Sequence, residues 1–285
     1  MSVLVRRSVL PSQLWAITMS TRATLVTMRD PDEGLDADGL IVTGARRDRV
    51  AEPFRPVVVA AIDQVQVRGD DCSLYIYGSA ATGVAKPGTS DVDLLTIGVP
   101  TSAAAAMSTR LSVEFAGVCR AVEVATAYSP DYERDDDESY GNRVFLRHYC
   151  VHLVGPDVGS TLPRYPGDTL AARGFNGDLA QHALRWRATF DQGVEAGALG
   201  RRVARKVLLA VAALVSVHDR IWTTDREFAA LRWSQIEPFV ANDLTMLLDW
   251  ADNRLEPTET EVRAALDGVV SSTTSAFQRW IGLWP

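Results

Sequence analysis

Two carboxylates lie two residues apart where the chain passes from a loop of small residues into an apolar run. The stretch from Leu74 to Gly98 reads LYIYGSAATGVAKPGTSDVDLLTIG, and Asp91 and Asp93 open its second apolar run. In a strand, residues i and i+2 project from the same face, so these two side chains would be neighbours. Neighbouring carboxylates repel each other unless a cation lies between them. The spacing therefore predicts a site for Mg²⁺, which prefers oxygen ligands and also binds phosphates.

A third carboxylate and a glycine–serine pair extend this constellation. Glu123 lies between two valines, so strand alternation points it to the face opposite those valines. If its strand neighbours the strand of Asp91 and Asp93, three carboxylates converge on one metal site. Gly78 and Ser79 follow an aromatic apolar run, and a turn there can present backbone N–H groups and a hydroxyl to a triphosphate.

The composition limits what such a site can serve. The 285 residues carry a net charge of −7 at pH 7, which argues against a nucleic-acid partner and suits a cationic substrate. No apolar run approaches the roughly 20 residues that span a bilayer, so no membrane is expected. Three widely spaced cysteines indicate reduced thiols in a cytoplasmic protein. No feature of the sequence indicates an oligomeric state.

The elements that would position these residues form a small α/β unit. Helical spacing covers residues 49–67, and an alanine-rich segment over 102–119 predicts a second helix. Short runs rich in aromatic and β-branched residues predict strands over 73–78, 91–99 and 121–128. The segment 145–158 is expected to add a helix and a Gly-Pro-Asp turn that close this unit.

The rest of the chain divides into a leader and a helical part. Residues 1–47 show no amphipathic pattern and are predicted to be a poorly ordered leader, and the α/β unit is expected over 48–160. From residue 168 onward the apolar spacing is helical, which predicts a four- or five-helix bundle over 168–285. Thr223 or Thr224 is expected to cap one of its helices. The predicted fold class is therefore α+β, with a small mixed sheet followed by an all-helical bundle.

These motifs resemble those of the nucleotidyltransferase superfamily related to DNA polymerase β. The signature of that superfamily is an apolar residue, Gly-Ser, a short spacer, and Asp-x-Asp between apolar residues. Within it, the strings from Tyr77 to Leu95 and from Arg120 to Val124 are similar to segments of aminoglycoside adenylyltransferases of the streptomycin/spectinomycin type. Those enzymes share a YGSA…G…KP…SD-x-DLL string and a later RA-x-EV segment.

The resemblance implies transfer of AMP from ATP to an acceptor hydroxyl, with release of pyrophosphate. Asp91, Asp93 and Glu123 would bind Mg²⁺, as two ions, and Glu123 would also be the base for the hydroxyl. The α/β residues that would bind the nucleotide are Gly78, Ser79 and Ser90. The bundle would bind a small-molecule acceptor, for which an aminoglycoside is the favoured candidate.

Basic and aromatic residues of the bundle are further candidates. In similar two-domain enzymes, basic residues of the helical domain reach the triphosphate, and the candidates in this chain are Arg202, Arg205, Lys206 and Arg220. The alternative for these cations is a solvated surface patch. One or two of the tryptophans in this part could line an acceptor pocket, while the others form core; these are Trp186, Trp222, Trp233 and Trp250.

Other interpretations of the sequence stay open. The same catalytic unit could adenylylate a protein or RNA, as in toxin–antitoxin pairs, or it could bind a nucleotide as a sensor without transferring it. His148 and His152, four residues apart, are expected to form a pair at a helix surface or a domain interface rather than a zinc site. The acidic stretch 131–139 is expected to be a solvated loop.

Overall fold

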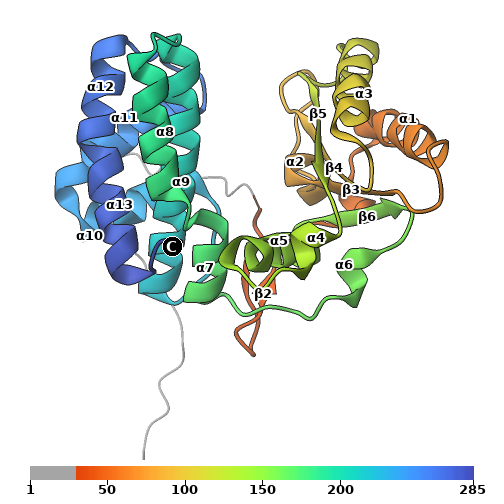
Figure 1. The fold of residues 1–285 in the computed structure, drawn as a ribbon, viewed down its shortest axis with the longest axis horizontal. Coiled ribbons are helices and arrows are strands. Elements are labelled where there is room, and N and C mark those ends of the chain that lie inside the picture. The colour runs from red at the N-terminus through yellow and green to blue at the C-terminus, as the bar shows by residue number, and fades with distance from the viewer. Residues whose placement is uncertain (1–29) are drawn as a thin grey trace, which may run out of the picture.

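The computed structural model describes residues 30–285, which form two lobes joined along one side (Figure 1). One lobe is a small sheet covered by helices on both faces, and the other is a helical bundle. The predicted α+β class is confirmed. Across the residues it describes, no helix is both long and apolar enough to cross a membrane.

The first lobe is built on a four-stranded mixed sheet in the order β5-β4-β3-β6. Strands β3 (Ser73–Tyr77), β4 (Val92–Ile97) and β5 (Val122–Ala127) confirm the three predicted strands. Strand β4 is parallel to β5 and antiparallel to β3. The parallel pair is joined by helix α3 (Thr101–Glu114), because two parallel strands need a crossover between them. Strand β6 (Val151–Val154) was not predicted, since it is a short run that follows a helix almost directly.

Helices cover both faces of this sheet. On one face, α1 (Arg55–Gln66) and α3 pack against the inward side chains of β3 and β4, which are Leu74, Ile76, Val92 and Leu94. On the other face, helices α4 to α6 pack against a second row of side chains that includes Tyr75, Leu95 and Ile97. Their bounds are α4 (Pro130–Glu133), α5 (Asp137–His148) and α6 (Val158–Thr161). Two short 3-10 turns precede α1, η1 (Arg47–Arg49) and η2 (Glu52–Phe54).

Residues 30–46, which we call the N-terminal strap, connect the two lobes. Strands β1 (Gly34–Leu35) and β2 (Ile41–Val42) pair as a small hairpin. The Ile41 side chain is buried in the core of the helical lobe. Toward the sheet lobe, the Arg46 N–H donates to the Ala81 carbonyl of α2 (Gly78–Thr82). The prediction of a poorly ordered leader is therefore wrong for residues 30–47, and its residues 1–29 lie outside the described residues.

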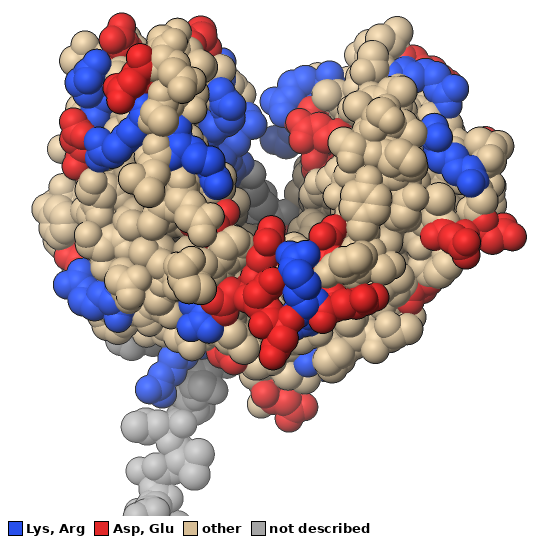
Figure 2. Space-filling view, viewed as in Figure 1, with Lys and Arg blue, Asp and Glu red and all other residues tan. Residues whose placement is uncertain are grey.

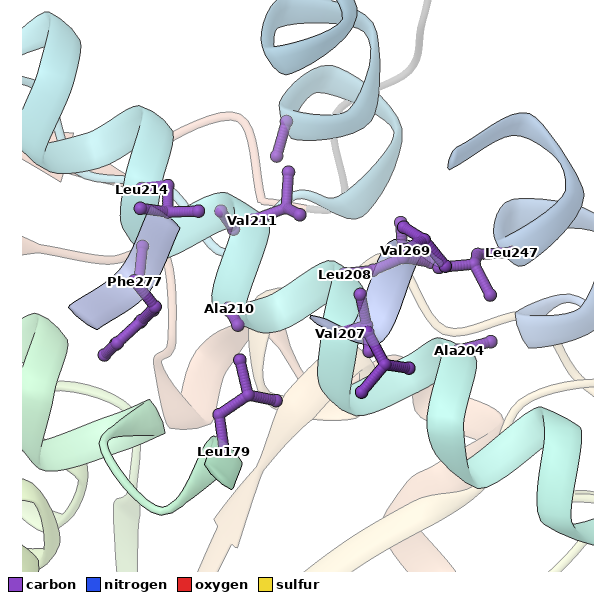
Figure 3. Packing of buried hydrophobic residues seen from close by; sticks show 14 of the residues in the cluster. Leu179, Ala204, Val207, Leu208, Ala210, Val211, Leu214, Leu247, Val269 and Phe277 are labelled. Atoms are coloured by element: carbon purple, nitrogen blue, oxygen red, sulfur yellow. The ribbon is translucent and has the colours of Figure 1, made fainter. Parts of the chain in front are cut away.

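The helical lobe is arranged around one long helix, α9 (Ala196–Asp219), which contacts α7, α8 and α10 to α13. Figure 3 shows Val207, Leu208 and Val211 of α9 among side chains from the surrounding helices. The surrounding helices are α7 (Thr169–Asn176), α8 (Leu179–Asp191), α10 (Arg226–Ile236), α11 (Ala241–Ala251), α12 (Glu259–Asp267) and α13 (Val269–Trp280), with the 3-10 turn η3 (Pro238–Val240) before α11.

The bundle differs from its prediction in three places. The last predicted helix divides at Gly268 into α12 and α13, so α8 to α13 make six helices rather than four or five. Helix α7 was not predicted. The cap of α10 is Asp225, whose side chain accepts from the Phe228 N–H, because Thr224 is instead bonded to the strap.

Candidate active site

A row of three polar side chains crosses strands β3, β4 and β5 at one end of the sheet. The strand register pairs Tyr77 of β3 with Asp93 of β4, and Asp93 with Glu123 of β5. Residues paired across neighbouring strands lie on the same face, so the three side chains are adjacent. Glu123 is exposed, while Val122 is buried beneath α3, which confirms the predicted alternation of β5. The expected neighbourhood of the two carboxylate-bearing strands is therefore present.

Asp93 is a carboxylate in an unfavourable place for a charge. Burial, with further contributions from Glu123 and Asp91, raises its pKa from 3.8 to about 7. In the described part of the chain, no hydrogen bond or ion pair holds this carboxylate. Gly78, at φ +68°, lies against it, and a Cβ at that position would collide with Asp93 Oδ2. A carboxylate without an ion pair, beside the carboxylate of Glu123, offers the oxygen ligands that a hard divalent cation such as Mg²⁺ prefers.

Asp91, the other carboxylate of the predicted pair, directly precedes β4 and is held by a cation of the chain itself. Arg120 binds it with two N–H groups, Nε to Oδ1 at 2.9 Å and Nη2 to Oδ2. Among the residues from 30 to 285, no three His, Cys, Asp or Glu side chains are arranged to hold a metal ion. In this structure Asp93 and Glu123 are neighbours, whereas Asp91 is engaged by Arg120. That Asp91, Asp93 and Glu123 together bind a metal ion stays a prediction.

The glycine–serine turn and Ser90 shape the loop around these carboxylates. Gly78 begins α2, and Ser79 is half-buried in its first turn. The Ser79 carbonyl accepts from two N–H groups of the following loop, which folds that loop back over α2. The Ser90 hydroxyl accepts from the Lys86 N–H at 2.9 Å, and the Ser90 carbonyl accepts from the Arg120 N–H at 3.1 Å. Ser90 thus ties the residue before Asp91 to the preceding loop and to the segment that carries Arg120.

A cavity of about 300 Å³ lies between the two lobes and reaches the glycine–serine turn. Tyr77 and Gly78 line it from the sheet lobe, and Lys206 lines it from α9. The Lys206 ammonium pairs with Asp178 at 2.7 Å and donates to the Phe175 carbonyl at 3.1 Å. Much of the remaining wall is aromatic and consists of Phe145, Tyr149, Phe175 and Trp222.

The structure separates the four predicted basic residues of the bundle. Lys206 lines the cavity, whereas Arg202, Arg205 and Arg220 are exposed side chains outside its lining. Figure 2 shows basic side chains along the inner edge of the helical lobe, facing the notch between the lobes. Of the four tryptophans, Trp222 lines the cavity, and the other three are buried in the bundle core.

Sequence reasoning missed Glu33 of the strap, which supports the back of this cavity. Its carboxylate accepts from the Tyr149 hydroxyl at 2.6 Å and from the Thr224 N–H and hydroxyl at 2.6 and 2.7 Å. The Trp222 Nε1–H in turn donates to the Tyr149 hydroxyl at 2.7 Å. Burial raises the pKa of Glu33 although these groups donate to it. No local pattern marked this residue, because all its partners are distant in the sequence.

Two other expectations concern the junction of the lobes. His148 ends α5 and His152 lies in β6, so the expected pair on one helix face is not formed. Burial lowers the pKa of His148 to about 4, and its Nε2 accepts from the Tyr165 N–H.

The acidic stretch 131–139 forms α4 and the start of α5 rather than a loop, and Arg134 at its centre forms ion pairs. Figure 2 shows this cluster at the junction.

One comparison with known protein families bears on the sheet lobe. Residues 60–156 match the family described as the nucleotidyltransferase domain. The match runs from within α1 to just beyond β6, and it contains Gly78, Ser79, Asp91, Asp93 and Glu123. No curated protein sequence matches the chain. The match supports nucleotidyl transfer as the general activity of this lobe and supports the superfamily that the motifs indicated.

Proposed function

We propose that the chain is a Mg²⁺-dependent adenylyltransferase that moves AMP from ATP to a hydroxyl of a small-molecule acceptor. The observation that carries this proposal is the pair formed by Asp93 and Glu123 beside Gly78, a residue that also lines the cavity between the two lobes. The pair lies within the segment that matches a nucleotidyltransferase domain. ATP, Mg²⁺ and the acceptor are the parts of the proposal that go beyond this match.

The reaction assigns a task to each polar group of the site. Asp91 and Asp93 would hold Mg²⁺, which when bound neutralises charge that develops on the phosphates. The Ser79 hydroxyl and the N–H groups of its turn would bind phosphate oxygens. Glu123, exposed beside Asp93, would take the proton of the acceptor hydroxyl, whose oxygen forms a bond to the α-phosphorus of ATP. The bond between the α-phosphorus and its bridging oxygen breaks, and pyrophosphate leaves.

Lys206 is the bundle residue that we assign to the nucleotide. Lys206 lines the cavity that Gly78 also lines, and we therefore assign it to a triphosphate held at the glycine–serine turn. Asp178 and the Phe175 carbonyl fix the ammonium in this position. We propose no nucleotide contact for the exposed Arg202, Arg205 and Arg220.

An aminoglycoside is the acceptor that we favour. The motif strings of the sheet lobe are similar to those of aminoglycoside adenylyltransferases, and the net charge of −7 suits a polycationic ligand. Acidic side chains gather at the junction of the lobes, where an acceptor would approach the cavity (Figure 2). The bundle would then supply the second wall of the acceptor site.

An acceptor screen tests the proposal. Pyrophosphate release from ATP and Mg²⁺ is followed with aminoglycosides, tRNA and a protein lysate as acceptors, and Asp93→Asn serves as the control without catalysis. We expect release that depends on an aminoglycoside and is lost in the variant. Release with protein or tRNA alone would move the function to macromolecular targets. Binding of ATP without release under any condition would identify a nucleotide sensor.

A further inference from the structure

Arg120 belongs to a motif of the sheet lobe, but the reaction described above gives it no task. Its backbone N–H is bonded to the Ser90 carbonyl, so the start of its side chain is fixed beside Asp91. Its guanidinium binds both oxygens of Asp91, yet 52 % of the side chain is exposed, against 14 % for Asp91. The guanidinium of Arg120 is thus held by the carboxylate of Asp91, while about half of the Arg120 side chain is exposed to solvent.

The position of this guanidinium conflicts with metal binding. A divalent cation at Asp91 would lie next to a positive charge that already neutralises the same carboxylate. Correspondingly, the described residues contain no three acidic or other metal-ligating side chains arranged around a common point. For Asp91 to join Asp93 as a ligand, Arg120 has to leave it. Because the side chain is half-exposed, it can do so without disturbing the core.

We infer that Arg120 is an exchangeable counter-ion, which holds Asp91 in the metal-free protein and pairs with the nucleotide's phosphates once the metal has taken Asp91. This inference rests on the proposed function. A guanidinium binds phosphate oxygens with the same two-pronged geometry that it uses for a carboxylate. The metal ion alone should bind weakly, because it competes with Arg120 for Asp91. The metal–nucleotide complex should bind more strongly, because its phosphates give Arg120 a new partner. Metal and nucleotide would therefore bind together.

Titration calorimetry on the full chain tests this without any turnover. The ligands are Mn²⁺ alone, as a stand-in for Mg²⁺, and Mn²⁺ with α,β-methylene-ATP, which cannot release pyrophosphate. Arg120→Gln should bind Mn²⁺ alone about twofold to fivefold more tightly, the range expected when an exposed ion pair no longer competes. The same variant should bind the Mn²⁺–analogue complex about tenfold to a hundredfold more weakly, because a charged hydrogen bond to phosphate is lost.

Two further variants make the result specific. Arg120→Lys keeps the charge but loses the paired N–H groups, so it should fall between wild type and Arg120→Gln in both titrations. Arg110→Gln, on the exposed side of α3, removes an equal charge away from Asp91 and should change neither. An Arg120→Gln variant in which both affinities fall, or neither changes, overturns the inference. A wild-type chain that does not bind the Mn²⁺–analogue complex overturns the proposed function instead, and this inference with it.

Discussion

At the scale of single residues, the carboxylate of Asp93 is a group whose charge destabilises the folded protein. Asp93 is half-buried beside Glu123 and near Asp91, and no described group forms a hydrogen bond or an ion pair with it. An amide of the same shape would pack equally well at this position without the cost of a charge. Perturbed carboxylates of this kind concentrate at functional sites, where a ligand supplies the missing charge.

Replacing Asp93 by Asn should therefore abolish transfer and stabilise the metal-free protein. The pKa of Asp93 is about 7 in the folded chain and near 3.8 when unfolded, so between these values the folded state binds the extra proton. Wild-type stability should fall as pH rises from about 4 to 7, whereas Asp93→Asn should lack this loss. At pH 8 we expect the variant to be more stable by about 1–3 kcal/mol. Urea unfolding in EDTA at pH 4.5 and pH 8 measures the difference.

Two results would speak against this description of Asp93. Wild type and Asp93→Asn with the same dependence of stability on pH would show that Asp93 titrates normally. An Asp93→Asn variant with wild-type turnover at saturating ATP would remove it from the metal site. Asp91→Asn provides the matched comparison, because it should also lose transfer without the same gain in stability at pH 8.

Substitution of Glu123 should slow the transfer reaction without weakening nucleotide binding. Its proposed task concerns the acceptor hydroxyl, so Glu123→Gln should bind Mg²⁺–ATP almost as wild type does, yet transfer about 10²- to 10⁴-fold more slowly. Calorimetry of ATP binding and a single-turnover assay together measure the two effects. Weakened Mg²⁺-dependent binding would make Glu123 mainly a metal ligand. Unchanged turnover would exclude it from the site.

At the scale of elements, the N-terminal strap connects parts of the chain that the sequence does not relate. Its Ile41 is buried among bundle residues, and the Ile41 N–H donates to the Tyr165 carbonyl. Its Glu33 holds Thr224, in the loop before α10, and Tyr149 at the back of the cavity. A segment with these contacts is part of the folded core, whatever its composition indicates.

Truncating Ile41 to Ala should consequently destabilise the protein by about 2–4 kcal/mol, as for other fully buried aliphatic side chains. The neighbouring Val42, which is only half-buried in the same strand, offers a matched control, and Val42→Ala should cost about 1 kcal/mol or less. Equilibrium unfolding in urea measures both. Equal, small effects of the two substitutions would mean that the strap does not contribute to the stability of the fold.

Local patterns in the sequence predicted the elements that carry the carboxylates. The three strands, α1 and α3 follow from alternation, apolar spacing and composition, and the alternation also gave the face of Glu123. What the sequence did not reveal depends on distant contacts. Glu33 finds its partners more than a hundred residues away, and Arg120 meets Asp91 through the parallel pairing of β4 with β5. The short strand β6 is defined by its pairing with β3 rather than by its four residues.

At the scale of the whole molecule, residues of both lobes line the cavity between them, and for this reason we propose that the bundle contributes to nucleotide binding. Lys206→Met should weaken Mg²⁺–ATP binding about tenfold or more, because it removes a cation from the cavity wall. Arg202→Met, one turn earlier on α9 and exposed, should leave binding nearly unchanged. Calorimetric titration of both variants, with thermal unfolding as a check of the fold, measures this. Equal losses in the two variants would indicate a diffuse charge effect.

The most direct measurement follows the α-phosphorus of ATP itself. The chain is incubated with Mg²⁺, α-labelled ATP and the acceptor found in the screen, and the label and pyrophosphate are quantified together. We expect one labelled AMP on the acceptor for each pyrophosphate released, with no transfer by Asp91→Asn or Asp93→Asn. Label that stays in ATP with every acceptor tested, or transfer that survives both substitutions, would contradict a nucleotidyltransferase site at these carboxylates.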